Sequence, residues 1–347
     1  MAPHRLGAVL GLLAAVSFGV SAPLAKLLLA DVSPQLLAGL LYLGAGFGLG
    51  VYRLARPGTR EAPLTRADLS PMLGVVALGG VCGPLLLMLG LARVSGTAGS
   101  LLLNLEAPLT IVLAAVLFGE HLGRRVVSAS ICIVLGAVVL RVNPGEVAAD
   151  LVGVVAVAAA CLCWALDNNL TQRLSLKDPF QIVRIKTLAA GAFNTGLALA
   201  LGASLPDART VGLALGLGVL SYGVSVVLDA YALRAHGAAR EAAYFATAPF
   251  VGAVAAVPLL GERLGEAELA AMVLMAAGVV LMLRERHAHE HAHEPLEHEH
   301  VHVHDEHHWH EHASGDPPGE PHAHRHCHER LIHDHLHVPD LHHRHRH

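Results

Sequence analysis

The chain has 347 residues, of which 54% are hydrophobic and 15% are charged, and its mean hydropathy is +0.52. This composition excludes an ordinary water-soluble protein, because apolar runs of about 20 residues, the mark of membrane-spanning helices, recur along the chain. The net charge of −4 is uneven: residues 287–347 hold 12 of the 28 Asp and Glu residues, 4 of the 24 Lys and Arg residues and 23 of the 26 histidines. We therefore expect an integral membrane protein that ends in a separate histidine-rich tail.

Ten transmembrane helices are expected in chain order, at 6–29, 34–54, 71–92, 97–118, 125–141, 151–174, 180–202, 210–232, 239–260 and 267–284. Proline and glycine separate several of them, as at Arg56-Pro57-Gly58 and Asn143-Pro144-Gly145. The first apolar run also has the basic start of a signal peptide, but it continues to Ala30, which favours a membrane helix. We predict two five-helix domains, 1–142 and 143–286, and a disordered tail, 287–347.

The two five-helix units share a sequence pattern. Residues 92–123 contain Ala107-Pro108 followed by Gly119-Glu120, and residues 233–265 contain Ala248-Pro249 followed by Gly261-Glu262. Because five is an odd number, the second unit must enter the membrane from the opposite side. The fold class we expect is therefore all-α, with ten helices arranged as two inverted repeats, an architecture common among secondary transporters. The recurrence of the two glutamates suggests a structural role in their loops.

The distribution of positive charge predicts the orientation of the helices. If the N-terminus is cytoplasmic, 14 Arg and Lys residues fall on the cytoplasmic side and 4 on the outside. Cytoplasmic loops carry the excess of basic residues in membrane proteins. We therefore expect a multi-pass protein of the plasma membrane with both termini in the cytoplasm.

Glu106 is the first candidate for a functional residue. It lies about ten residues into the expected helix 97–118, where a charge costs roughly 2.5–3.5 kcal/mol on insertion scales. Asn104 precedes it by two residues, and Pro108 follows and removes a backbone donor from the helix. A carboxylate beside a loosened helix indicates a substrate or proton site, and a structural ion pair is the alternative.

Further polar residues lie in the expected helices of the second unit. Asp167 and Asn168 form a polar cluster late in their helix, one turn after Trp164, and either face a cavity or mark the helix end. In the next helix Lys186 and Asn194 are two turns apart, and Lys186 is placed to neutralise Glu106 or Asp167 or to bind an anionic group. Asp229 is a further candidate, for which pairing with Arg234 is the alternative. The predicted substrate-binding or coupling residues are thus Glu106, Asn104, Trp164, Asp167, Asn168, Lys186, Asn194 and Asp229.

The tail alternates histidine with other residues over long stretches, so that neighbouring imidazoles of an extended segment point the same way. Neutral imidazole suits Zn, Ni, Co and Cu ions, and binding weakens below about pH 6 as imidazole protonates. The composition predicts disorder without metal. The candidate metal ligands are His287, His289, His291, His293, His298, His300, His302, His304, His307, His308, His310, His312, His322, His324, His326, Cys327 and His328.

Ten helices in two units, each with Ala-Pro and then Gly-Glu near its end, resemble the drug/metabolite transporter superfamily, EamA type. Phe18-Gly19 and Trp164-Ala165 match the aromatic motif early in each unit. The resemblance covers about residues 1–286. It implies a secondary carrier, often an exporter of metabolites, amino acids or drugs, with a central cavity between the halves. The histidine-rich tail departs from the ordinary family pattern.

We expect a secondary transporter, an exporter of a small metabolite or drug-like solute working by alternating access, with proton coupling through Glu106 as a hypothesis. An enzyme is not expected, nor a required cofactor, and no G-x-x-x-x-G-K-[ST] motif points to ATP. The alternative is a divalent transition-metal (Ni, Co or Zn) transporter or a membrane-tethered metal buffer that uses the tail. The expected partners are the solute, the lipid bilayer and metal ions at the tail, without nucleic acid. A homodimer is a further possibility.

Overall fold

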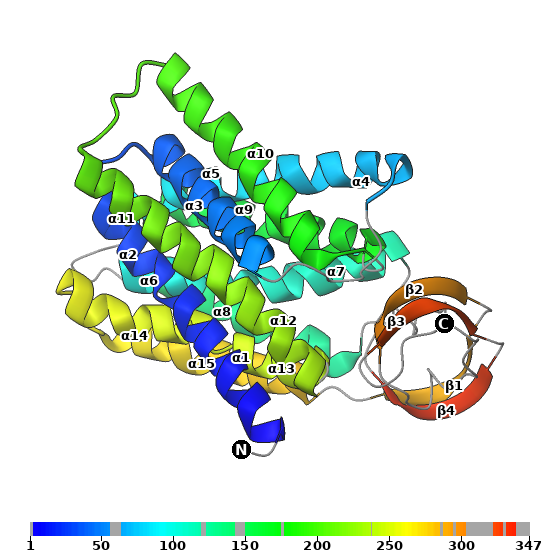
Figure 1. Ribbon diagram of the computed structural model, residues 1–347. Coiled ribbons are helices and arrows are strands. Elements are labelled where there is room, and N and C mark those ends of the chain that lie inside the picture. Colours follow the sequence, from blue (N-terminus) through cyan, green and yellow to red (C-terminus); the bar gives the residue numbers. More distant parts are fainter. Residues whose placement is uncertain are drawn as a thin grey trace.

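The computed structural model describes residues 3–55, 64–118, 123–142, 150–174, 177–236, 238–284, 287–293, 296–302, 322–328 and 331–337. For 3–6, 118, 141–142, 173, 233–241 and the tail segments it describes the backbone alone. Through residue 284 the described secondary structure is helical (Figure 1), which confirms the all-α membrane part that the sequence predicts.

The helices of the first repeat form five rods: α1 (Pro3–Gly19) with α2 (Ser21–Leu28), α3 (Pro34–Ala55), α4 (Leu69–Gly74) with α5 (Gly83–Leu91), α6 (Gly96–Leu102) with α7 (Glu106–Phe118), and α8 (Arg124–Val142). The second repeat follows the same order: α9 (Leu151–Thr171), α10 (Pro179–Ala200), α11 (Ala208–Gly218) with α12 (Ser225–His236), α13 (Ala238–Phe245) with α14 (Ala248–Leu260), and α15 (Glu266–Leu283). Among the described residues, eight rods are long and apolar enough to cross a membrane, and α8 and α10 are not among them. α10 contains Arg184, Lys186 and Asn194, which lower its mean hydropathy, and both rods pack within the same bundle.

Short non-α turns interrupt some rods. Single 3₁₀ turns lie at Arg66–Asp68, Leu103–Leu105 and Gln172–Leu174. The third rod of each repeat contains a π-helical segment, Val75–Cys82 between α4 and α5 and Val219–Val224 between α11 and α12. π-Helical turns are rare and occur frequently at functional sites. Their presence at the same place in both repeats extends the internal repeat from sequence to backbone geometry.

The pairing of the rods is symmetric between the repeats. α3 packs on α10, α6 on α14 and α8 on α15, so three rods pack on their own counterparts. α1 packs on α12 while α9 packs on α5, and exchanging the repeats converts one of these pairs into the other. Because each repeat has five rods, this pairing describes an inverted repeat with a pseudo-twofold axis in the membrane plane.

Gly136 and Gly278 show the symmetry at the closest packing of α8 on α15. A Cβ at Gly136 would lie 3.2 Å from the carbonyl oxygen of Ala271, and one at Gly278 would lie 2.8 Å from that of Ala129. Only glycine lets the two backbones approach so closely, and small residues serve this purpose widely in membrane helices. Each glycine therefore has the same role in its own repeat.

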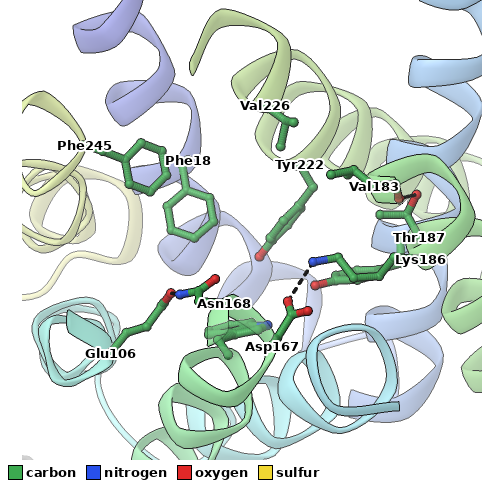
Figure 2. Close-up of a pocket in the computed structure, with 12 residues that line it drawn as sticks. Phe18, Glu106, Asp167, Asn168, Val183, Lys186, Thr187, Tyr222, Val226 and Phe245 are labelled. Carbon is green, nitrogen blue, oxygen red and sulfur yellow. Dashed lines mark hydrogen bonds and ion pairs between the residues drawn. The ribbon is translucent and has the colours of Figure 1, made fainter. Parts of the chain in front are cut away.

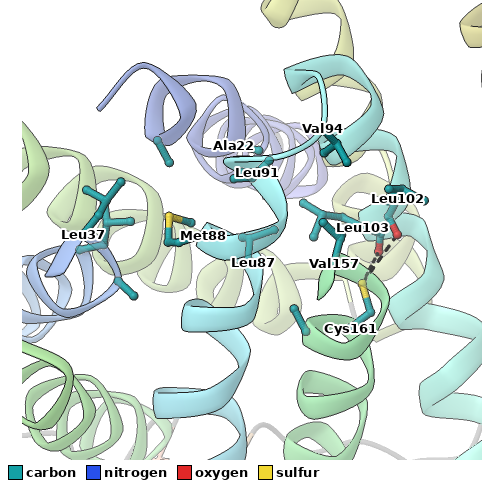
Figure 3. Close-up of a cluster of buried hydrophobic side chains, with 14 of the residues drawn as sticks. Ala22, Leu37, Leu87, Met88, Leu91, Val94, Leu102, Leu103, Val157 and Cys161 are labelled. Carbon is teal, nitrogen blue, oxygen red and sulfur yellow. Dashed lines mark hydrogen bonds between the residues drawn. The ribbon is translucent and has the colours of Figure 1, made fainter. Parts of the chain in front are cut away.

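The two ends of the bundle differ in their filling. We call the end where α5 and α14 finish and α6 begins the α6 end, and the opposite end, where α9 finishes and α10 begins, the α10 end. The half nearer the α6 end is filled by a cluster of fully buried side chains (Figure 3) that includes Ala22, Leu37, Leu91, Leu102 and Val157. This half is closed by apolar packing.

The described tail segments form four strands, β1 (His287–His293), β2 (Leu296–His302), β3 (His322–His328) and β4 (Leu331–His337). β1 pairs with β4, and β2 pairs with β3, in two antiparallel two-stranded ribbons. That the tail is disordered without metal stays a prediction. Alternation of histidine with other residues has a period of two, which matches the alternating faces of a strand.

Candidate functional site

A cavity lies between the two repeats, in the half of the bundle nearer the α10 end. Its cavity volume is about 180 Å³, which is below the roughly 300–1,000 Å³ typical of ligand pockets. Its lining comes from both repeats (Figure 2) and consists of Phe18, Tyr42, Glu106, Trp164, Asp167, Asn168, Val183, Lys186, Thr187, Tyr222, Val226 and Phe245.

Glu106 reaches the cavity because its rod is broken there. The 3₁₀ turn Leu103–Leu105 ends directly before Glu106, where α7 begins, and Pro108 follows in the first turn of α7. The amide of Asn168 on α9 donates a hydrogen bond of 2.9 Å to Glu106 Oε1. The carboxylate of the first repeat is therefore held by an amide of the second, across the cavity wall.

Asp167 and Lys186 form an ion pair in the same cavity. The ammonium nitrogen of Lys186 lies 2.8 Å from Asp167 Oδ2, and the two side chains are 17% and 5% exposed. Removing one partner of so buried a pair leaves an uncompensated charge and costs about 3–5 kcal/mol. Val183, Lys186 and Thr187 share one face of α10 by helical spacing, so this face lines the cavity.

Aromatic rings form most of the remaining wall. Phe18 contacts Phe245 and Tyr222, with ring centroids 5.2 and 5.7 Å apart, and Tyr222 contacts Tyr42 at 5.6 Å. The hydroxyl of Tyr42 and the indole nitrogen of Trp164 donate to the carbonyl oxygen of Gly79, at 3.0 and 3.1 Å.

Gly79 lies in the π-helical segment Val75–Cys82, where the regular α-helical hydrogen bonding is interrupted. The carbonyl freed in this segment fixes the orientation of two aromatic side chains in the cavity wall. The rare backbone geometry of the third rod is thereby connected directly to the site.

Five of the residues predicted from the sequence meet in this cavity: Glu106, Trp164, Asp167, Asn168 and Lys186. Of the two carboxylates that Lys186 could neutralise, the structure selects Asp167. Trp164 forms part of the wall, as expected of a large flat side chain near a cavity.

The other three predicted residues lie outside the cavity lining. Asn104 is buried, and its amide donates to the Leu101 carbonyl oxygen at 3.0 Å and faces the Met275 sulfur at 3.8 Å. Asn194 is fully buried and donates to the Val81 carbonyl oxygen at 3.3 Å. Asp229 is half-buried on α12. Asn104 and Asn194 therefore pack between helices.

Tyr42, Tyr222 and Phe245 belong to the lining but were not among the predicted site residues. The sequence offers one signal for them, since aromatic residues are only 4% of the chain. In membrane helices rich in Ala, Leu, Gly and Val, a rare aromatic side chain marks a position where a large group is accommodated. Which of the aromatics converge is decided by helix packing, which sequence periodicity does not report.

Glu262 joins the two repeats at the α6 end. Its Oε1 accepts a hydrogen bond of 2.6 Å from the Gly96 backbone amide, and its Oε2 accepts from the Thr97 amide at 2.8 Å and the Thr97 hydroxyl at 2.7 Å. Lys26 interacts electrostatically with Glu262 and donates to the Leu91 carbonyl oxygen at 2.8 Å. The carboxylate of the second repeat thus satisfies orphan amides at the start of α6, where a negative charge is favoured.

We expected the glutamates of the repeated Gly-Glu pattern to have a structural role in their loops. For Glu262 this role is a bridge between the two repeats. Glu120, its sequence counterpart, lies outside the described residues.

The candidate metal ligands of the tail fall into two groups. His304, His307, His308, His310 and His312 lie outside the described residues. The others lie on strands: His287, His289, His291 and His293 on β1, His298, His300 and His302 on β2, and His322, His324, His326, Cys327 and His328 on β3. The structure describes only the backbone of these strands. Among the side chains that it does describe, all before the tail, no three His, Cys, Asp or Glu residues are grouped closely enough to hold a metal ion.

Comparisons with known proteins agree with this architecture. The model of the EamA-like transporter family matches residues 5–142 and 151–284. An uncharacterized transporter of Methanothermobacter thermautotrophicus is 30% identical over 288 residues, which cover 78% of this chain and 83% of the relative. A solved crystal structure, 20% identical in sequence, superposes with a TM-score of 0.58 and covers 80% of this chain and 96% of its own; this likeness concerns the fold alone.

Proposed function

The chain belongs to the EamA-like transporter family and is a multi-pass membrane transporter, and we propose that it exports a small organic solute by alternating access. The cavity between the repeats carries the proposal. It combines an acid held by an amide, a buried ion pair and a wall of aromatic rings. Such a lining suits a metabolite or drug-like molecule with a charged or strongly polar group beside an apolar body, because apolar walls with few placed polar groups are typical of small-molecule sites.

Access to the cavity is proposed to change ends during transport. The described conformation has its cavity in the half nearer the α10 end, while apolar packing fills the half nearer the α6 end. An inverted repeat can exchange these states, because each repeat can adopt the arrangement of the other. In our account the two repeats rock about the cavity, and the bridge from Glu262 to Gly96 and Thr97 holds the α6 end shut.

Glu106 is proposed to couple transport to protons. Its carboxylate is half-buried at the break between the 3₁₀ turn and α7, and it accepts a hydrogen bond from the neutral amide of Asn168. Lys186 of the same cavity is bonded to Asp167, and a carboxylate at membrane depth whose hydrogen-bond partner is a neutral amide gains from taking up a proton, because the charged form is costly there. Solute entering beside it would release that proton, so that solute and proton exchange across the membrane.

The experiment for this step compares Glu106→Gln with Glu266→Gln, the same chemical change at an exposed position in the first turn of α15. Efflux of radiolabelled amino acids, aromatic amines and carboxylic acids is measured from sealed vesicles at several pH values. We expect Glu106→Gln to lose the stimulation of efflux by a pH gradient, while Glu266→Gln keeps it. A normal rate and normal pH dependence in Glu106→Gln would refute proton coupling through this residue.

We further propose that both termini are cytoplasmic in the plasma membrane, from the excess of basic residues on that side of the helices. The α10 end then faces the cytoplasm, and the cavity described here is the one that an exporter loads from inside the cell. Labelling a cysteine added after His347 only in permeabilised cells would support this orientation, and labelling in intact cells would oppose it.

A further inference from the structure

The strand register of the tail places histidine opposite histidine. In the first ribbon His287 pairs with His337, His289 with His335 and His291 with His333. In the second ribbon His298 pairs with His326, His300 with His324 and His302 with His322. Each ribbon therefore contains three cross-strand histidine pairs at alternate positions.

Alternation puts the three pairs of a ribbon on one face. Successive residues of a strand belong to opposite faces, and residues two apart share a face at a spacing of roughly 6.6–6.8 Å. Residues directly opposite in an antiparallel pair have Cβ atoms about 4.5–5.5 Å apart. Two neighbouring pairs thus bring four histidines to one face of the ribbon, a number of ligands that fills the tetrahedral shell of zinc.

We propose that each ribbon binds one divalent transition-metal ion through two neighbouring histidine pairs on this face. The middle pair, His289–His335 in the first ribbon and His300–His324 in the second, belongs to every such set of four. Zinc, nickel, cobalt and copper share the preference for imidazole, and Zn²⁺ is the probe we choose. The proposal goes beyond solute transport and concerns the tail alone.

The same register assigns Cys327 to the other face. Cys327 pairs with Glu297, and it alternates with His326 and His328 along β3. The sequence suggested that Cys327 adds a thiolate to the histidines, whereas the ribbon places it among the positions between them. The proposed sites are therefore made of imidazole only.

Metal also supplies what the ribbons lack. A two-stranded ribbon on its own is marginally stable in water. Glu290 is directly opposite Asp334, and like charges in this position are destabilising. A metal ion that binds four ligands from two strands contributes its binding free energy to the folding of the ribbon. Because imidazole must be neutral to bind, both metal affinity and ribbon formation decrease as the pH falls below about 6.

The test measures the number and affinity of Zn²⁺ sites on purified full-length protein by titration against a chromophoric chelator. We expect two tight sites. Loss of a group that supports a zinc ligand lowers metal affinity roughly 10- to 100-fold. Loss of a ligand itself should cost at least as much, so His289→Ala and His335→Ala should each lower the Zn²⁺ affinity of one site by at least this factor. Because both act on the same ribbon, the double variant should lose one site, whereas His289→Ala combined with His324→Ala should lose two.

A matched control keeps the composition unchanged. Exchanging His289 and Glu290 retains every residue type but moves one imidazole off the face, so the ribbon predicts loss of one tight site. Cys327→Ser should leave both sites intact. Unchanged Zn²⁺ binding in the exchanged variant, or loss of two sites in the variant with both His289 and His335 replaced, would overturn the proposal and assign binding to a histidine-rich chain without defined pairing.

Discussion

Removing the charge of Glu262 should shift the transporter away from the conformation described here. The two carboxylate oxygens accept three hydrogen bonds, from the Gly96 amide and from the amide and hydroxyl of Thr97. A glutamine keeps a single acceptor oxygen. If that oxygen stays with Thr97, the side-chain NH₂ group faces the Gly96 N–H, and a buried donor is left unpaired at a cost of about 1–3 kcal/mol.

In the proposed alternating-access mechanism the two repeats separate when the α6 end opens, so this cost applies only while that end is closed. A difference of about 1–3 kcal/mol between two states changes their ratio roughly 5- to 150-fold. Glu262→Gln should therefore increase the population that is open at the α6 end by such a factor. Glu266→Gln, four residues along the chain at an exposed position, should change nothing.

The assay is a distance measurement between spin labels at Ala92 and Arg263, two exposed positions on either side of the bridge, in a variant without the native cysteines. We expect a short distance to dominate in the parent protein and in Glu266→Gln, and a longer distance to gain population in Glu262→Gln. Identical distance distributions in all three proteins would refute the view that Glu262 holds the repeats together.

Two further changes test the packing and the cavity by thermal unfolding in detergent. Gly278→Ala inserts a methyl group against the backbone of α8 and should destabilise the fold by about 1–3 kcal/mol, whereas Gly212→Ala, whose new Cβ would meet no atom of another helix within 4 Å, should not. Equal melting temperatures would contradict the close approach of α8 and α15. Lys186→Met leaves the buried Asp167 unpaired and should cost about 3–5 kcal/mol, against about 1 kcal/mol or less for Arg93→Met in an exposed pair. Adding Asp167→Asn to Lys186→Met should restore most of the loss, and a double variant as unstable as the single one would count against a paired charge.

The membrane part of the fold was predictable because it depends on local signals. Apolar runs interrupted by proline and glycine indicate where helices begin and end, and a repeated Ala-Pro and Gly-Glu pattern indicates two units. The charge of Glu106, Asp167 and Lys186 singled them out, since a charge at membrane depth needs a partner or a function. The structure brings these three residues to one cavity.

The rest depends on how helices turn toward one another, which hydropathy does not encode. Asn104 and Asn194 had the same sequence signal as Asn168, yet each donates to a backbone carbonyl in the packing between helices. The π-helical segments also gave no sequence signal, although the carbonyl of Gly79 orients Tyr42 and Trp164. Partner choice and backbone irregularity are settled by tertiary contacts, which a single sequence does not report.

Solute flux through the purified protein tests the central claim most directly. Sealed vesicles containing either the full chain or the chain ending at Arg286 are loaded with labelled amino acids, aromatic amines and carboxylic acids, and in parallel with zinc, nickel or cobalt ions. We predict saturable, protein-dependent efflux of an organic solute from both kinds of vesicle. Metal flux that requires the protein, without flux of any organic solute, would contradict the account and identify the metal ion as the transported species.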